Sequence, residues 1–261
     1  MMSDLLYEVG LCTDTGRRRA NNEDNMISVV PEDPAVLARK GVLLIVADGL
    51  GGHDKGEVAS EMVVNEVNKR YYEDEENDDV VASLLQAIQQ ANKAVYTGSK
   101  ASGMAERVMG TTCTAAVLLG DQAHIMNVGD SRAYLVRQDE VRQVSQDHSW
   151  VAEQVRAGIL TAEQARSHVQ RNVITRCMGA HINVEVDVFK EMLQPGDTLV
   201  LCSDGLSNMV SDEEIGALVQ QHTPQESATH LVTLANEHGG SDNITVVVAR
   251  VSPNDQKVSD A

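Results

Sequence analysis

The sequence predicts an α+β fold whose β-structure is mainly antiparallel. Strand-like runs follow one another through tight turns, and helical segments come in pairs between those runs, so the strict β-α-β alternation of a doubly wound parallel sheet is absent. The chain has 261 residues, 42% of them hydrophobic, which allows a sizeable core and excludes a disordered chain. Because no internal repeat and no Gly/Ser-rich linker interrupts it, we expect a single domain over residues 1–251 and a polar, disordered tail over residues 252–261.

Runs of β-branched and other apolar residues predict the strands. The run at residues 42–47 is unbroken, which predicts a strand buried on both faces. In residues 183–189, Val184, Val186 and Val188 alternate with other residues, which predicts an edge strand with these valines on one face. The predicted strands cover residues 5–12, 25–30, 42–47, 111–119, 122–128, 132–137, 183–189, 198–202 and 244–251.

Apolar residues at helical spacing predict the helices. Thr161 and Ser211 each have a Gln or Glu three residues later, which is the spacing of a capping box, and Pro224 follows Thr223 at a first helical position. The predicted helices cover residues 57–72 and 80–96, residues 149–170 in two pieces, and two segments that begin at Ser211 and at Thr223.

An acidic segment, residues 73–79, connects the first two predicted helices. It lacks the ordered spacing and the glycine of a calcium-binding loop, so we expect a solvated turn there.

Charge and cysteine content narrow the class of protein. The net charge of −18 disfavours nucleic acid and anionic membranes as partners, since phosphates would be repelled. The N-terminus lacks a basic region followed by an apolar stretch, and no apolar run approaches the ~20 residues that span a bilayer, so we expect a cytoplasmic protein. The isolated cysteines indicate buried thiols rather than a disulfide or zinc framework; they are Cys12, Cys113, Cys177 and Cys202.

Five aspartates lie at the ends of predicted strands, namely Asp24, Asp48, Asp130, Asp204 and Asp242. In an antiparallel pair the end of one strand lies beside the start of its neighbour, so one rim of the fold could collect all five. Two carboxylates ~4 Å apart repel by about 4 kcal/mol at an effective dielectric near 20, so the rim would need cations. A lone Asp-Gly pair would more simply be a turn.

The side chains at this rim favour Mg²⁺ or Mn²⁺ over Zn²⁺, because they offer oxygen ligands without interleaved Cys or His. Two such ions ~4 Å apart would lower the pKa of a shared water and hold a phosphoryl oxygen. Arg19, close in sequence to Asp24, could bind a phosphate through two hydrogen bonds.

Six motifs in order then resemble a known family, the metal-dependent protein Ser/Thr phosphatases of type 2C in their bacterial form, over about residues 7–251. The motifs are Arg19-Ala20-Asn21-Asn22-Glu23-Asp24, Asp48-Gly49-Leu50-Gly51-Gly52-His53, Gly110-Thr111-Thr112, Val128-Gly129-Asp130-Ser131-Arg132, Ser203-Asp204-Gly205-Leu206 and Ser241-Asp242-Asn243. The resemblance implies a four-layer αββα sandwich of two mainly antiparallel sheets flanked by helix pairs. It also implies hydrolysis of phosphoserine and phosphothreonine in proteins, dependent on Mn²⁺ or Mg²⁺.

The resemblance further implies a role for each site residue: two tightly bound ions and a third, weaker one, with a metal-bridging hydroxide attacking phosphorus in line and no phospho-enzyme. By this resemblance Asp48 bridges two ions, the Gly49 carbonyl binds one, Asp204 and Asp242 hold the other, Asp130 with Asp204 holds the third, Glu23 and Asp24 act through metal-bound waters, and Arg19 binds the substrate phosphate.

One departure concerns the general acid. Some eukaryotic members carry His directly after the Asp-Gly pair, where this chain has Leu50, and the nearest imidazole is His53. His53 could be that acid or a hydrogen-bonding loop residue. Residues 147–180 match the variable flap, a subdomain that in the family influences substrate access.

Two other functions compete with a protein phosphatase. A catalytically silent scaffold that binds phosphoproteins or a kinase would be expected to lack metal carboxylates, and none is missing. A phosphatase of small phospho-metabolites is the other alternative. From the resemblance we expect phosphoprotein substrates, a cognate Ser/Thr kinase that the enzyme opposes in signalling, and a monomer.

Overall fold

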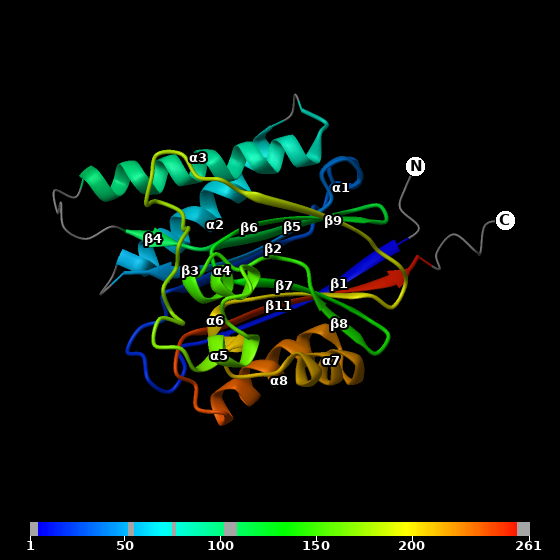
Figure 1. Ribbon diagram of the computed structural model, residues 1–261. Helices are drawn as coiled ribbons and strands as arrows, with labels where there is room; N and C mark the ends of the chain where they lie inside the picture. The colour runs from blue at the N-terminus through cyan, green and yellow to red at the C-terminus, as the bar shows by residue number, and fades with distance from the viewer. Residues whose placement is uncertain (1–4, 52–54, 75–76, 102–108, 255–261) are drawn as a thin grey trace.

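The structure is a computed structural model that describes residues 5–51, 55–74, 77–101 and 109–254. Two antiparallel sheets are stacked between two layers of helices (Figure 1). The α+β sandwich expected from the sequence and from the resemblance is therefore confirmed.

Each sheet is antiparallel throughout its strand pairs. The first has the order β1-β11-β10-β7-β8, with β1 Leu5–Asp14, β11 Ile244–Pro253, β10 Thr198–Cys202, β7 Arg132–Arg137 and β8 Glu140–Gln143. The second has the order β2-β3-β5-β6-β9, with β2 Asp24–Val29, β3 Val42–Leu50, β5 Cys113–Leu119, β6 Gln122–Val128 and β9 Asp187–Met192, and with β4 Gly110–Thr111 paired to the end of β3.

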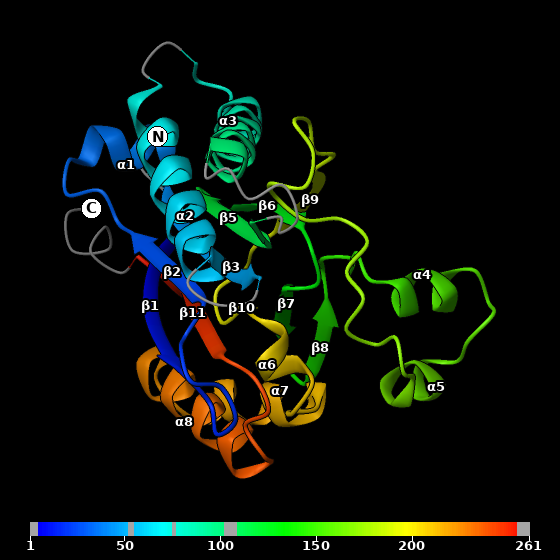
Figure 2. The ribbon, with the colours of Figure 1, turned by 90° about the vertical axis from the view of Figure 1, so that its left-hand side faces the viewer.

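Helices cover the outer face of each sheet. On the second sheet lie α2 Lys55–Glu73 and α3 Val80–Ala101, and on the first lie α6 Asp204–Ser207, α7 Asp212–Gln221 and α8 Pro224–Glu237. Two short helices, α4 Trp150–Arg156 and α5 Ala162–Ser167, project away from the sandwich within the segment expected to form a flap (Figure 2), and α1 Pro34–Lys40 precedes β3.

The unbroken apolar run at residues 42–47 lies in β3, a strand with a hydrophobic core on each face. Leu43 and Ile45 face the core beneath α2 and α3, whereas Leu44 and Val46 face the core between the two sheets. Because both faces of β3 are covered, all four side chains are fully buried. A third core, beneath α7 and α8, completes the layers.

The prediction for residues 183–189 was only partly right. The strand β9 begins at Asp187, opposite Asn127, and lies at the sheet edge as expected. Val184 and Val186 pack against the core from the preceding loop, whereas Val188 is 44% exposed. The three valines therefore do not line one face of a strand, because β9 begins only after Val186.

Several short elements were not predicted: α1, α6 and β8. The predicted turn at residues 129–131 is present, but it carries the chain from β6 in one sheet to β7 in the other. Strand β11 extends to Pro253, two residues into the expected tail, and residues 255–261 lie outside the described residues.

The acidic connection between α2 and α3 is a solvated turn in its described part, as expected. Asp79 is exposed and caps α3, accepting hydrogen bonds from the backbone of Val81 at 3.0 Å and Ala82 at 3.2 Å. Beneath the turn Lys40 is 1% exposed, and its ammonium group donates to the Asn77 carbonyl at 3.0 Å. Residues 75–76 of this segment lie outside the described residues.

The prediction of buried thiols is right for Cys113 and Cys202 but not for Cys12 and Cys177, which are only half-buried. All four cysteines are free thiols, and Cys113 and Cys202 are buried in strands. Within the described residues, each helix is too short or too polar to cross a membrane.

Candidate metal centre

The strand register brings Asp24 and Asp48 together, as predicted. Strands β2 and β3 pair antiparallel with Asp24 directly opposite Asp48. Asp24 is 8% exposed, while Asp48 lies at the partly open rim. The first two candidate ligands therefore share one end of the second sheet.

Asp204 and Asp242 reach the same place from the first sheet. Asp204 opens α6 just after β10, and Asp242 lies just before β11, the strand that pairs with β10. Both are partly exposed. The expected pairing of their strands is thus confirmed.

Ser203 links the two sheets at this point. Its hydroxyl donates to Asp24 Oδ2 at 2.7 Å and accepts the backbone N–H of Thr245 at 3.0 Å. Ser203 is fully buried, so this bond fixes the Asp24 carboxylate from the opposite sheet.

Asp130 enters from the turn between the sheets. Neighbouring Ser131 shares a 2.7 Å hydroxyl–hydroxyl hydrogen bond with Thr112, whose Oγ1 also accepts the backbone N–H of Asp48 at 2.8 Å. Gly129 has φ +112°, and a Cβ there would lie 2.5 Å from Thr112 Cγ2, so only glycine fits.

The electrostatics show that all five aspartates interact. Removal from solvent raises the pKa of Asp24 to about 7 and that of Asp204 to about 6, and neighbouring carboxylates add to both. The pKa values of Asp48 and Asp130 are raised well above the ordinary range for the same reasons. Ionising any of these four carboxyl groups is unfavourable, because the charge is removed from solvent and is repelled by the neighbouring carboxylates.

Two buried oxygens of the cluster receive no hydrogen bond within the described residues. Asp24 Oδ1 and Asp130 Oδ1 are buried and have no hydrogen-bond partner in the described part of the chain. Among the described residues, no three His, Cys, Asp or Glu side chains are grouped so that they could hold a metal ion by themselves. The set of converging acidic oxygens nevertheless fits hard divalent cations, which take oxygen ligands and offset the repulsion.

The backbone around Glu23 and Gly49 is tightly packed. Gly49 donates its N–H to the Glu23 carbonyl at 3.1 Å, and a Cβ on Gly49 would lie 2.5 Å from that oxygen and 2.3 Å from the carbonyl oxygen of Gly56. Glu23 is 9% exposed, and its carboxylate lies against Gly56 in the first turn of α2. Glycine at position 49 therefore leaves its backbone beside the cluster without a side chain.

Arg19 lies at the open side of the cluster. Its guanidinium forms a 2.7 Å ion pair with Asp242 Oδ2, and its side chain is 48% exposed. The structure thus places Arg19 beside the candidate ligands with one side free to solvent. His53 lies outside the described residues.

Sequence reasoning gave no role to Ser203, Thr112 and Asn243. The Asn243 side chain accepts the Glu23 N–H at 2.8 Å and donates to the carbonyls of Thr15 and Asn21 at 2.9 Å, so it holds the loop that carries Arg19 and Glu23. All three residues stand within the six motifs, and their adjacency to the aspartates was the signal that could have identified them.

A double-sheet sandwich with acidic oxygens and an arginine at one end defines a metal-dependent phosphatase. Comparison with known proteins agrees with this class. A sequence profile of the family described as protein phosphatase 2C matches residues 18–239. The chain belongs to the protein phosphatase 2C family and is a protein serine/threonine phosphatase, so its substrates are phosphoproteins.

The relatives cover almost all of the chain. The serine/threonine phosphatase stp of Listeria innocua is 41% identical over 240 residues, which span 90% of this chain and 92% of the relative. The crystal structure of the Mycobacterium tuberculosis phosphatase PstP/Ppp has a TM-score of 0.84 at 38% identity, covering 94% of this chain and 99% of that one. A structure of the PstP catalytic domain in complex with two manganese ions has a TM-score of 0.82 at 37% identity, covering 95% and 99% of the two chains.

Proposed function

We propose that the carboxylate cluster is the active site, and that it hydrolyses phosphoserine and phosphothreonine with two Mn²⁺ or Mg²⁺ ions and a third, weaker one. The observation that carries this is the convergence of five aspartates. The pKa values of Asp24, Asp48, Asp130 and Asp204 are raised, and Asp24 and Asp130 each keep a buried oxygen without a hydrogen-bond donor in the described residues. The manganese complex of the related PstP domain supports the choice of ion.

The residues would divide the ions between them as follows. Asp48 and the Gly49 carbonyl would hold one ion, Asp48 with Asp204 and Asp242 the second, and Asp130 with Asp204 the third, while Glu23 and Asp24 would act in the shell around them. When bound, such ions lower the pKa of a coordinated water and polarise a phosphoryl oxygen.

The protein's own side chains orient the reactants. An exposed ion pair contributes little, with a median of about 0–1 kcal/mol, so Arg19 can leave Asp242 and bind the substrate phosphate at small cost. Ser203 keeps Asp24 in place, and Asn243 keeps the Arg19–Glu23 loop in place.

Direct hydrolysis agrees with the surroundings of Ser203 and Cys202, the side chains that precede Asp204. Ser203 Oγ is buried and already donates to Asp24, and burial raises the pKa of the Cys202 thiol to about 12. Neither is exposed or activated, so a covalent phospho-enzyme is not supported.

Further proposals follow from the family and the charge. We infer a cognate Ser/Thr kinase as the opposing enzyme, no nucleic-acid partner at a net charge of −18, a monomer, and a single phosphatase domain over residues 1–251 with a flap at 147–180.

The test is dephosphorylation of a phosphothreonine peptide with Mn²⁺, with EDTA, and with the variant Asp204→Asn. We expect turnover with Mn²⁺, none with EDTA, and a loss of at least about 100-fold in the variant, because even residues that only support a metal ligand contribute 10–100-fold. Asp139→Asn, in an exposed turn, is the matched control. Full activity of Asp204→Asn would disprove the site, and peptide binding without turnover would indicate a scaffold.

A further inference from the structure

The segment 147–180 leaves the sandwich after β8 and rejoins it before β9, and its hydrogen bonds place its base beside the Asp130 turn. At its base Thr175 donates its N–H to the His148 carbonyl at 2.8 Å, and Met178 donates to the Thr111 carbonyl at 2.8 Å. Thr111 in turn donates its hydroxyl to the Asp48 carbonyl at 2.9 Å. Both ends of the segment are therefore hydrogen-bonded close to the candidate ligands.

His148 holds the residue that precedes Asp130. Its ring Nδ1 accepts the N–H of Gly129 at 3.0 Å, and its own backbone N–H donates to the Gly129 carbonyl at 2.9 Å. His148 is 3% exposed, and Thr112 closes the other side of Gly129. Both polar backbone groups of Gly129 thus bond to His148, and the Gly129 carbonyl also accepts the side-chain amide of Asn127 at 3.1 Å.

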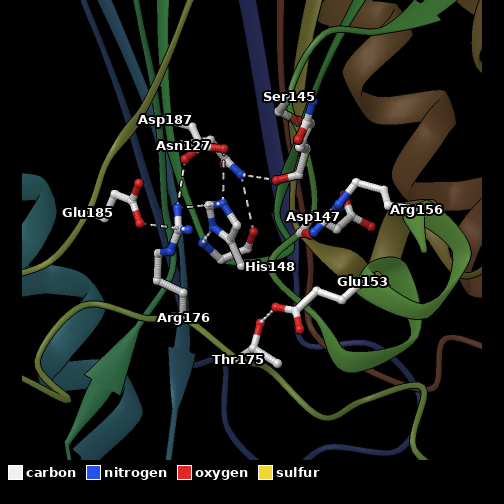
Figure 3. A network of polar contacts seen from close by, with 12 residues as sticks. Asn127, Ser145, Asp147, His148, Glu153, Arg156, Thr175, Arg176, Glu185 and Asp187 are labelled. Atoms are coloured by element: carbon white, nitrogen blue, oxygen red, sulfur yellow. Dashed lines mark hydrogen bonds and ion pairs between the residues drawn. The ribbon is translucent and has the colours of Figure 1, made fainter.

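The other ring nitrogen faces a carboxylate. Because Nδ1 accepts the Gly129 N–H, the neutral ring carries its proton on Nε2, which lies 3.2 Å from Asp187 Oδ2. Nη1 of Arg176 lies 2.9 Å from the same Nε2, so with the proton there the guanidinium contacts the ring without donating to it. Arg176 donates to the second oxygen of Asp187 at 2.7 Å, and Figure 3 shows the three side chains facing one another. Asp187 and Arg176 together therefore fix the orientation of the ring, while the Gly129 N–H at Nδ1 selects its tautomer.

We propose that His148 is a positioning residue of the active site: as the Nε2–H tautomer, held by Asp187 and Arg176, it sets the Gly129–Asp130 turn and thereby the position of the Asp130 carboxylate. This rests on the proposed function of Asp130. It follows that the ion held at Asp130 depends on the base of the 147–180 segment.

Two variants of similar shape distinguish the contact of Nδ1 with Gly129 from the contact of Nε2 with Asp187. His148→Asn keeps an acceptor close to the Nδ1 position and loses the contact with Asp187, whereas His148→Gln keeps a group near Nε2 and loses the acceptor for Gly129. Calorimetric titration with Mn²⁺ should show a larger loss at the weakest site in His148→Gln, about tenfold, than in His148→Asn. His168→Gln, in the same segment but with its ring against Trp150, is the control and should match the unaltered chain.

A second measurement needs no variant to fold. In the metal-free protein, ¹⁵N–¹H correlation of the His148 ring should show the proton on Nε2 and none on Nδ1, and the opposite tautomer would overturn the proposal. So would equal Mn²⁺ losses in the two His148 variants, which would indicate general damage to the segment. Asp130→Asn distinguishes the proposed metal-binding role of Asp130 from the positioning role of His148. If it leaves Mn²⁺ binding unaltered, the assigned role of Asp130 fails; if it weakens binding while His148→Gln does not, only the positioning role fails.

Discussion

Single hydroxyl and amide groups hold this site together. Ser203 reaches across from the first sheet to Asp24 on the second, and Asn243 spans more than 200 positions of sequence to hold Glu23 and Asn21. Each of these bonds is buried or half-buried, so removing one would leave an unsatisfied polar group. The precision of the cluster therefore depends on neutral residues as well as on acidic ones.

The role of His53 can be decided by the leaving group of the substrate. If His53 protonates the leaving oxygen, His53→Ala should slow a phosphothreonine peptide by about 100-fold and p-nitrophenyl phosphate by less than about threefold, since an aryl oxide leaves without a proton. Comparing kcat on the two substrates is the measurement. His181→Ala, at an exposed position, is the control. An equal loss on both substrates would exclude the acid role.

At the scale of elements, removing the same kind of N-cap should affect the stability of the protein differently at two helices. Thr161 and Thr223 both complete capping boxes, at the start of α5 and α8 respectively. No residue of α5 is buried, whereas α8 buries one face against the first sheet. The same local motif therefore belongs to a peripheral helix in one case and to the core in the other.

We expect Thr223→Ala to lower the free energy of unfolding by about 1 kcal/mol, which is ~2–4 °C in Tm for a chain of this size. Thr161→Ala should leave the Tm unchanged, because α5 can open without exposing core residues. Thermal unfolding followed by circular dichroism measures both. A comparable drop in the two variants would show that α5 unfolds together with the sandwich.

At the scale of the whole molecule, the gathered aspartates make stability depend on pH and metal. The pKa values of Asp24 and Asp204 are raised by burial to about 7 and about 6, above their unfolded values. The native state therefore binds more protons than the unfolded state, and without metal this contribution to stability is present in acid and is lost as pH rises through 6 to 7.

In EDTA, Asp204→Asn should consequently raise the Tm, and the gain should grow from about pH 5 to about pH 8 as the cluster ionises. With Mn²⁺ the order should reverse, since bound ions stabilise only the chain that holds them. Scanning fluorimetry across this range measures both, with Asp139→Asn as the reference. A metal-free Asp204→Asn less stable than the unaltered chain at every pH would contradict the argument.

Much of the fold could be predicted because short patterns of apolar and capping residues indicate which segments form buried strands and helices. The strand Thr198–Cys202 was correct to the residue. The predicted capping residues Ser211 and Thr223 are the N-caps of α7 and α8, since an apolar run and a capping box are complete within a few positions. The pairing of Asp24 with Asp48 was also predicted, because antiparallel neighbours with short connections constrain their own register. By contrast, β8 is a short, half-exposed strand without a strong pattern, and Val188 alternates correctly but lies on an uncovered face.

The sequence by itself determined the longer elements, the acidic residues at their ends and the family to which the chain belongs. Only the tertiary structure decided that β6 and β7 lie in different sheets, that Ser203 and Asn243 hold the cluster, and that His148 holds the Asp130 turn. The physical reason is distance along the chain. Burial and capping are local and leave a periodic signature, whereas a hydrogen bond between distant segments has no signature until packing brings its two partners together.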